Sequence, residues 1–99
     1  MANWLLLDRD GTLCERHHYL TRPEQVRLID GVGEALKVAG SRGLRFAVIT
    51  NQSAVARGFM AQSDLDKVHS QLAGLLEVYG VEIEAFYSCT HLPTDGCHC

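Results

Sequence analysis

The sequence predicts an α/β protein with a Rossmann-like, parallel, three-layer sheet, and three features of the chain support this fold class. Residues 4–7 and 44–50 are continuous apolar runs, which are typical of parallel strands covered on both faces. A segment with helical periodicity follows each run, and glycines mark its end. A third strand then completes a strand, helix, strand, helix, strand order, for which right-handed crossovers are the rule.

The first half of the chain is predicted to hold one strand and one helix. The strand is residues 4–7, and residues 14–29 are predicted as an extended loop with a short irregular strand near VRLI. Asp30 is a candidate N-cap for a helix that ends within residues 40–43. The apolar residues of this helix, at helical spacing, are Val32, Ala35, Leu36 and Ala39.

The second half is predicted to add two strands around a longer helix. Residues 44–50 form the second strand, and a loop through residues 52–59 leads to the helix, which Gly80 ends. Residues 81–88 then form a third strand, nearer a sheet edge. The apolar residues of the helix are Leu65, Val68, Leu72, Leu75, Leu76 and Tyr79.

The composition indicates one soluble globular domain, residues 1–99. We expect this domain in the cytoplasm. The chain is 46% hydrophobic and 21% charged, which is ordinary for a folded protein. A net charge of -3 disfavours nucleic acid and anionic membranes as partners. The N-terminal apolar run is too short for a signal sequence or a membrane span.

Two carboxylates, Asp8 and Asp10, directly follow the first strand, in the sequence DRDGT. Ligands of parallel sheets gather at the carboxyl ends of the strands, where Thr50 and Asn51 also fall. A bound Mg²⁺ would compensate the acidic pair, and this ion commonly joins one or two carboxylates to a substrate phosphate. The pattern therefore predicts a phosphate monoester as substrate, with Asp8 attacking phosphorus and Asp10 transferring protons.

Plainer interpretations of these residues remain open. DRDGT is also compatible with a strand-terminating Asp-Gly turn whose two acids are solvated. Thr50 and Asn51 are compatible with a simple strand exit. A lone Cys14 is more often a packing residue than a nucleophile, and His69, on the second helix, is expected at the surface.

The last eleven residues, CTHLPTDGCHC, have the composition of a metal site. Their pattern is CxH, five residues, then CxC, and three thiolates with one imidazole suit tetrahedral Zn²⁺. A filled four-ligand shell makes this zinc structural, with free thiols as the alternative. The predicted ligands are Cys89, His91, Cys97 and Cys99.

Two motifs carry a resemblance that runs from Leu5 to Cys99. DRDGT after an apolar strand resembles the first signature of the haloacid dehalogenase superfamily, whose phosphohydrolases use an aspartate nucleophile. VITNQSAVARG, residues 48–58, is similar to the D-glycero-D-manno-heptose 1,7-bisphosphate phosphatases of that superfamily. The related histidinol-phosphate phosphatases are the alternative, and typically differ at Ser53. The resemblance implies removal of the 7-phosphate of heptose bisphosphate, in lipopolysaccharide-core or nucleotide-heptose precursor synthesis.

The resemblance also implies roles for matched residues. Asp8 becomes the nucleophile and a Mg²⁺ ligand, while Asp10 becomes the acid/base and lends its backbone carbonyl to Mg²⁺. Thr50 holds the transferring phosphoryl group, and the zinc ligands transfer directly. Arg57 is compatible with a phosphate contact or with a surface position. The residues implied to bind substrate are Arg16, His17, His18, Tyr19, Thr50, Asn51, Gln52 and Ser53.

Part of the family pattern is missing from these 99 residues. The resemblance implies a basic segment and a further strand with a metal-binding Asp beyond the zinc loop, both packing beside the first strand. Without them one flank of the sheet is bare, which predicts a partner or a missing C-terminal segment that completes the sheet. The rival hypothesis is a non-catalytic, zinc-stabilised fragment of such an enzyme.

Overall fold

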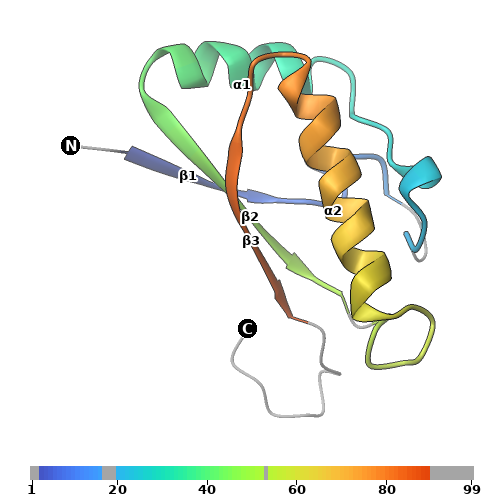
Figure 1. The fold of residues 1–99 in the computed structure, drawn as a ribbon. Helices are drawn as coiled ribbons and strands as arrows, with labels where there is room; N and C mark the ends of the chain where they lie inside the picture. The colour runs from blue at the N-terminus through green and yellow to red at the C-terminus, as the bar shows by residue number, and fades with distance from the viewer. Residues whose placement is uncertain (1–2, 17–19, 53, 90–99) are drawn as a thin grey trace.

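The computed structural model describes residues 3–16, 20–52 and 54–89 (Figure 1). These residues form one parallel sheet, in the order β1, β2, β3, together with two α-helices and a short 3₁₀ helix. The elements in chain order are β1 (Asn3–Asp8), η1 (Pro23–Gln25), α1 (Val32–Ser41), β2 (Leu44–Asn51), α2 (Gln62–Glu77) and β3 (Ile83–Cys89). The predicted parallel α/β class is therefore confirmed.

Both helices of the described chain cover the same face of the sheet. Leu36 of α1 and Leu72 of α2 belong to one core cluster with Phe46 and Val48 of β2. The strand order follows the chain order, and successive crossovers of the same hand place their helices on the same side. Within the described residues, the third layer of the predicted architecture is not found.

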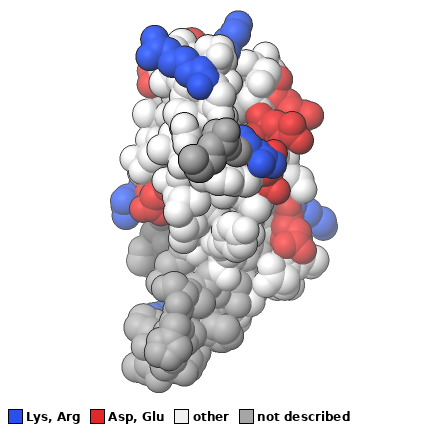
Figure 2. All heavy atoms as spheres, turned by 90° about the vertical axis from the view of Figure 1, so that its left-hand side faces the viewer, with Lys and Arg blue, Asp and Glu red and all other residues white. Residues whose placement is uncertain are grey.

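The other face of the sheet is open in the described chain. Ile49 of β2 pairs with Tyr87 of β3, and Leu6 of β1, which pairs with Ala47, precedes the Ile49 partner Asp8 by two residues. Leu6, Ile49 and Tyr87 are 60%, 44% and 61% exposed. The side of the molecule away from α2, on the left of Figure 1, is largely uncharged at its centre, and its charged side chains gather toward the margins (Figure 2). Exposed apolar side chains that lie close together are typical of interaction surfaces.

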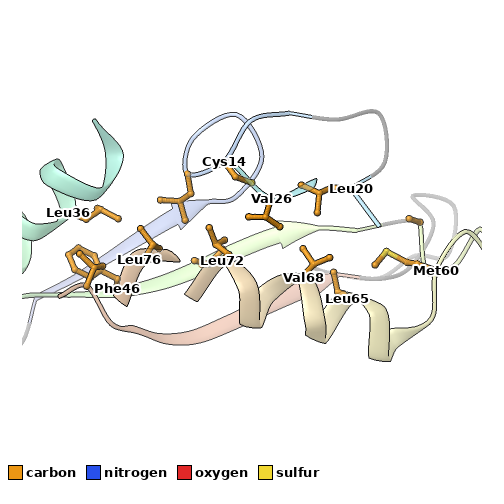
Figure 3. Close-up of a cluster of buried hydrophobic side chains, with 14 residues drawn as sticks. Cys14, Leu20, Val26, Leu36, Phe46, Met60, Leu65, Val68, Leu72 and Leu76 are labelled. Carbon is orange, nitrogen blue, oxygen red and sulfur yellow. The ribbon is translucent and has the colours of Figure 1, made fainter. Parts of the chain in front are cut away.

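The core holds the loop after β1 against α2. Leu65, Val68 and Leu72 of α2 converge with Cys14 and Val26 of the loop segment (Figure 3), and all five are almost fully buried. Burial of each large aliphatic side chain contributes about 1.5–3 kcal/mol. The chain that leaves β1 is therefore anchored, and its first residues occupy defined positions.

Several element boundaries differ from the predictions, and hydrogen bonds or backbone conformation account for three of them. Asp30 does not cap α1, because Gly31 takes the N-cap position with φ +86°. Helix α2 begins at Gln62, earlier than its apolar pattern, because Asp64 accepts a hydrogen bond from the Ala61 N–H at 2.9 Å. The third strand begins later than predicted, because the Val81 N–H donates to the Leu76 carbonyl and closes the helix end.

The predicted irregular strand near VRLI is reduced to isolated pairing. Leu28 forms an antiparallel bridge with Cys14, and the Ile29 N–H donates to the Leu13 carbonyl at 3.1 Å. The pairing returns the loop to the end of β1. No helix of the described residues is long and apolar enough to cross a bilayer.

Candidate active site

The chain reverses sharply where β1 ends. Leu5 and Leu7 point into the core, so the alternation of the strand leaves Asp8 exposed and turns Arg9 inward, where its side chain is 1% exposed. The Arg9 carbonyl accepts hydrogen bonds from the Leu13 and Cys14 N–H groups at 2.9 and 3.2 Å, which closes the turn. The Asp8 side chain therefore lies in solvent, and the neighbouring Arg9 side chain lies in the core.

The carboxylate of Asp10 is held by several donors at once. The Arg9 guanidinium donates to both of its oxygens, from Nε to Oδ1 and from Nη2 to Oδ2, each at 3.1 Å. The Gln52 amide Nε2 donates to Oδ2 at 3.0 Å. A fork of this kind fixes the direction of a carboxylate as well as stabilising its charge. Asp10 is therefore oriented before any ligand arrives.

The end of β2 supplies the second side of the site. Thr50 and Gln52 are both buried, and Gln52 Nε2 also donates to the Thr50 hydroxyl at 2.5 Å. Asp8 pairs with Ile49 across the strands, and a hollow of about 320 Å³ beside them is lined by Leu6, Leu7, Asp8, Ile49 and Thr50. The structure thus brings Asp8, Asp10, Thr50 and Gln52 together at the carboxyl ends of two strands.

For the other predicted site residues, the structure describes only some of the positions. Arg16 lies over the turn, and its Nη2 is 3.4 Å from the Asp10 carbonyl oxygen. Arg57 is exposed. Asn51 and Cys89 end β2 and β3, but their side chains are not described. The predicted residues that lie outside the described residues altogether are His17, His18, Tyr19, Ser53, His91, Cys97 and Cys99.

The donor set at the end of β1 fits a hard cation. The Asp8 carboxylate is exposed, and its Oδ1 accepts one hydrogen bond, from the Arg9 N–H at 3.1 Å. The Asp10 carboxylate is engaged by Arg9 and Gln52. The second candidate oxygen is the Asp10 backbone carbonyl, which accepts a long hydrogen bond from Arg16 Nη2 at 3.4 Å. Mg²⁺ typically takes one or two protein oxygens and completes its shell with water and phosphate. The described residues hold no group of three or more His, Cys, Asp or Glu side chains.

His69 is buried, and its expected surface position is wrong. The ring is 6% exposed, stacks on Phe86 of β3 with centroids 4.5 Å apart, and places Nε2 3.2 Å from Arg9 Nη1. Burial, followed by the positive charge of Arg9, lowers the pKa of His69 to about 4. The ring is therefore neutral near pH 7, and it meets Arg9 as an uncharged partner.

Two patterns in the sequence would have located Arg9 and His69. His69 lies four residues after Leu65 and three before Leu72, on the apolar stripe of α2. Arg9 continues the inward alternation of Leu5 and Leu7. Both are polar residues at positions that face the core. Buried polar groups are nearly always hydrogen-bonded, so a polar residue at such a position is expected to have a buried partner.

Cys14 lies in the core beside the acidic turn. Its thiol is 1% exposed and lies 3.7 Å from both the Arg9 carbonyl oxygen and Asp10 Oδ1. Burial, followed by the negative charge of Asp10, raises the pKa of this thiol to about 11. Cys14 is therefore a protonated packing residue at neutral pH, as its sequence context predicts.

The fold, with its acidic turn at the end of β1, is that of the haloacid dehalogenase-like phosphatases. A putative phosphatase of this type from Mesorhizobium loti superimposes with a TM-score of 0.85 at 28% identity, covering 99% of this chain and 46% of that one. The D,D-heptose 1,7-bisphosphate phosphatase from B. bronchiseptica, solved with magnesium and phosphate, gives a TM-score of 0.92 at 28% identity, covering 98% and 55%. No protein-family profile matches the chain.

The relatives that are similar in sequence bear the name of heptose bisphosphate phosphatases. The D-glycero-beta-D-manno-heptose-1,7-bisphosphate 7-phosphatase of Haemophilus ducreyi is 37% identical over 90 residues, which cover 90% of this chain and 50% of the relative. A probable enzyme of the same name from Thermoplasma volcanium is 30% identical over 95 residues, covering 96% and 65%. The predicted resemblance is confirmed. The chain spans about half the length of the Haemophilus relative.

Proposed function

We propose that this chain carries the nucleophile and the acid/base residue of a Mg²⁺-dependent phosphatase that acts on a sugar phosphate monoester. The observation that carries the proposal is the arrangement at the end of β1. Asp8 is exposed beside the hollow next to Thr50, while Asp10, two residues on, is fixed by Arg9 and Gln52. A free carboxylate next to a fixed one suits nucleophilic attack combined with proton transfer.

The reaction proceeds in two displacements. An Asp8 oxygen attacks phosphorus, the bond from phosphorus to the sugar oxygen breaks, and Asp10 protonates the leaving alkoxide. Water then attacks the aspartyl-phosphate, Asp10 takes its proton, and the bond from phosphorus to the Asp8 oxygen breaks. Inorganic phosphate leaves, Asp8 returns to the carboxylate, and Asp10 returns to the protonated acid with which the cycle began. Thr50 lines the hollow, and in this mechanism its hydroxyl donates to the phosphoryl oxygens.

Mg²⁺ would be held by the Asp8 carboxylate and the Asp10 backbone carbonyl, with water and substrate phosphate completing the shell. When bound, this ion cancels the repulsion between the Asp8 carboxylate and the phosphate and stabilises charge on the phosphoryl oxygens. Support comes from the B. bronchiseptica phosphatase, which was solved with magnesium and phosphate on the same fold.

The 7-phosphate of D-glycero-D-manno-heptose 1,7-bisphosphate is the substrate that we propose. Its support is the name shared by the relatives from Haemophilus ducreyi and Thermoplasma volcanium, at 37% and 30% identity. The predicted sugar-phosphate contacts are the loop residues Arg16, His17, His18 and Tyr19. We further propose a cytoplasmic setting, where a reducing environment keeps zinc-binding thiols reduced.

Full activity is proposed to need additional polypeptide on the open face of the sheet. The apolar side chains of Leu6, Ile49 and Tyr87 are exposed there, close to Asp8. The chain covers 55% of the B. bronchiseptica phosphatase, so the remainder of that protein offers a natural complement. A partner chain or a C-terminal segment would close this face and shield the phosphoryl group from water.

Phosphate release tests the proposal directly. The 99-residue chain, and a chimera that joins it to the unmatched part of the B. bronchiseptica phosphatase, are each incubated with Mg²⁺ and heptose bisphosphate or histidinol phosphate. We expect the chimera to release phosphate from heptose bisphosphate, and the chain alone to be slower by about 100-fold or more, because electrostatic stabilisation of the phosphoryl group is incomplete.

Two variants make this test specific. Asp8→Asn removes the nucleophile from an exposed position and is expected to abolish release without loss of folding. Asp30→Asn changes another exposed carboxylate, remote from β1 in the chain, and serves as the matched control. Equal rates for Asp8→Asn and the unaltered chimera would refute the mechanism. Preference for histidinol phosphate would refute the proposed substrate, and an inactive chimera would favour a non-catalytic fragment.

We also propose a structural Zn²⁺ held by Cys89, His91, Cys97 and Cys99. The CxH and CxC spacing supports it, because a complete tetrahedral shell of thiolates and imidazole binds zinc without an open position. Purification under reducing conditions should give about one zinc per chain, and a Cys97→Ser variant should lose most of it. Less than half an equivalent in the unaltered chain would contradict the site.

A further inference from the structure

A continuous series of contacts runs from β3 through α2 to the acid/base candidate, beginning with an aromatic stack and continuing through polar contacts. Phe86 of β3 stacks on the ring of His69 at a centroid separation of 4.5 Å and an interplanar angle of 11°. His69 Nε2 lies 3.2 Å from Arg9 Nη1, and the other side of the guanidinium binds both oxygens of Asp10. Sixty residues of sequence separate the two ends of the Arg9–His69 contact.

The chemistry of the contact defines the tautomer of the imidazole. Arginine has donors and no acceptor, so the nitrogen that faces Arg9 Nη1 must accept, which leaves the proton on Nδ1. A protonated ring would present a second donor and a second positive charge to the guanidinium. The geometry therefore requires a neutral His69 with an unprotonated Nε2.

Arg9 has little freedom once these partners are in place. The side chain is 1% exposed, and its Nε and Nη2 donate to Asp10 while Nη1 donates to His69. The charge of a buried guanidinium demands such partners, because an unpaired buried ion is costly. Without the acceptor on His69, Arg9 would rotate toward other acceptors and carry the Asp10 carboxylate with it.

We propose that His69 and Arg9 are positioning residues for Asp10, with His69 fixing the guanidinium and the guanidinium fixing the carboxylate. This inference rests on the proposed function for its catalytic consequence, although the arrangement itself does not. Neither residue contacts the substrate in this proposal. They act by keeping Asp10 in line with the leaving oxygen, where a displacement of about 1 Å typically costs about 100-fold in rate.

The kinetic test compares substitutions at His69 in the form of the protein that releases phosphate. His69→Leu removes the acceptor, and we expect kcat to fall between about 10-fold and 100-fold while KM changes less than about 3-fold. His69→Gln restores an acceptor through its side-chain oxygen and should recover most of kcat. Glu84→Gln breaks the exposed Arg45 pair and serves as the control, with an unchanged kcat.

Nuclear magnetic resonance tests the arrangement in the 99-residue chain, without substrate. Ring ¹⁵N shifts should show His69 with an unprotonated Nε2, and the Arg9 Nε–H should exchange slowly with water because it is buried and hydrogen-bonded. The His69→Leu variant should speed this exchange. Circular dichroism and thermal melting of each variant verify that it remains folded.

Each result bears on the inference. A protonated Nε2, or unchanged Arg9 exchange in His69→Leu, would overturn the arrangement. An unchanged kcat in a folded His69→Leu variant, or no recovery in His69→Gln, would overturn the positioning role. If no form of the protein releases phosphate, the proposed function fails, and the resonance measurements still decide whether His69 and Arg9 hold Asp10.

Discussion

Two arginine–carboxylate pairs, at opposite ends of the sheet, share a bidentate geometry and differ in the burial of the arginine. Arg9 binds Asp10 with both distances at 3.1 Å, and the arginine is 1% exposed. Arg45 binds Glu84 at 2.6 and 2.7 Å, yet its side chain is 47% exposed and rests on the Trp4 ring. The shorter pair is the weaker one, because water screens its attraction and solvates each partner when it breaks.

The largest expected effect comes from removing the buried guanidinium. Arg9→Met keeps a similar length but leaves Asp10 and His69 without their partner. We expect a loss of about 3 kcal/mol in the free energy of unfolding, the lower end for a broken buried pair, because Asp10 is partly open to solvent. Chemical denaturation measures this change. A loss smaller than about 1 kcal/mol would show that the buried pair contributes no more to the free energy of unfolding than an exposed pair does.

Thiol labelling of Cys14 probes the environment of the buried pair. The raised pKa of about 11 leaves little thiolate at neutral pH, and the side chain is 1% exposed. We expect iodoacetamide to modify Cys14 at least about 100-fold more slowly in the folded chain than in urea. Peptide mass mapping distinguishes this cysteine from the three others. Rapid labelling in the folded state would show that the core beside Asp10 opens readily.

Acid should destabilise the buried pair through His69. The folded chain holds the pKa of this ring at about 4, below the unfolded value of about 6.5, so the unfolded state binds the proton more strongly. The stabilisation that the neutral His69 ring contributes is complete above about pH 6.5 and is lost as pH falls toward 4, a change on the order of 3 kcal/mol. Unfolding curves across this range should be flatter for His69→Gln. Identical pH profiles for the two chains would contradict a neutral buried imidazole.

The smallest effect is expected at the exposed pair. Arg45→Lys and Glu84→Gln should leave the denaturation midpoint within experimental error, because both side chains return to water when the pair is lost. Trp4 is the only tryptophan, so its fluorescence reports the loss of the stacked guanidinium separately. A change as large as that of Arg9→Met would show that distance, and not burial, ranks the two pairs.

Local pattern was sufficient for the elements and for part of the site. The apolar runs of β1 and β2 and the periodic stripe of α2 predict their own secondary structure, since each is a property of neighbouring residues. Parallel strands end at one edge, so Asp8 and Thr50 could be expected together from the order of the elements alone. The arrangement of layers was harder to predict from the sequence. The strand order that places both helices on one face is a property of the whole sheet.

The sequence by itself determined which residues stand where the strands end: an acidic pair at the end of β1, a hydroxyl and an amide at the end of β2, and a cysteine and histidine pattern that starts at the end of β3. Only the tertiary structure decided how the acidic pair is divided, with Asp8 exposed and Asp10 bound through Arg9 to His69. The physical reason is the distance along the chain over which each effect acts. Alternation and periodicity act over a few residues, whereas a buried charge must find its partners wherever the folded chain brings them, here on a helix sixty residues away.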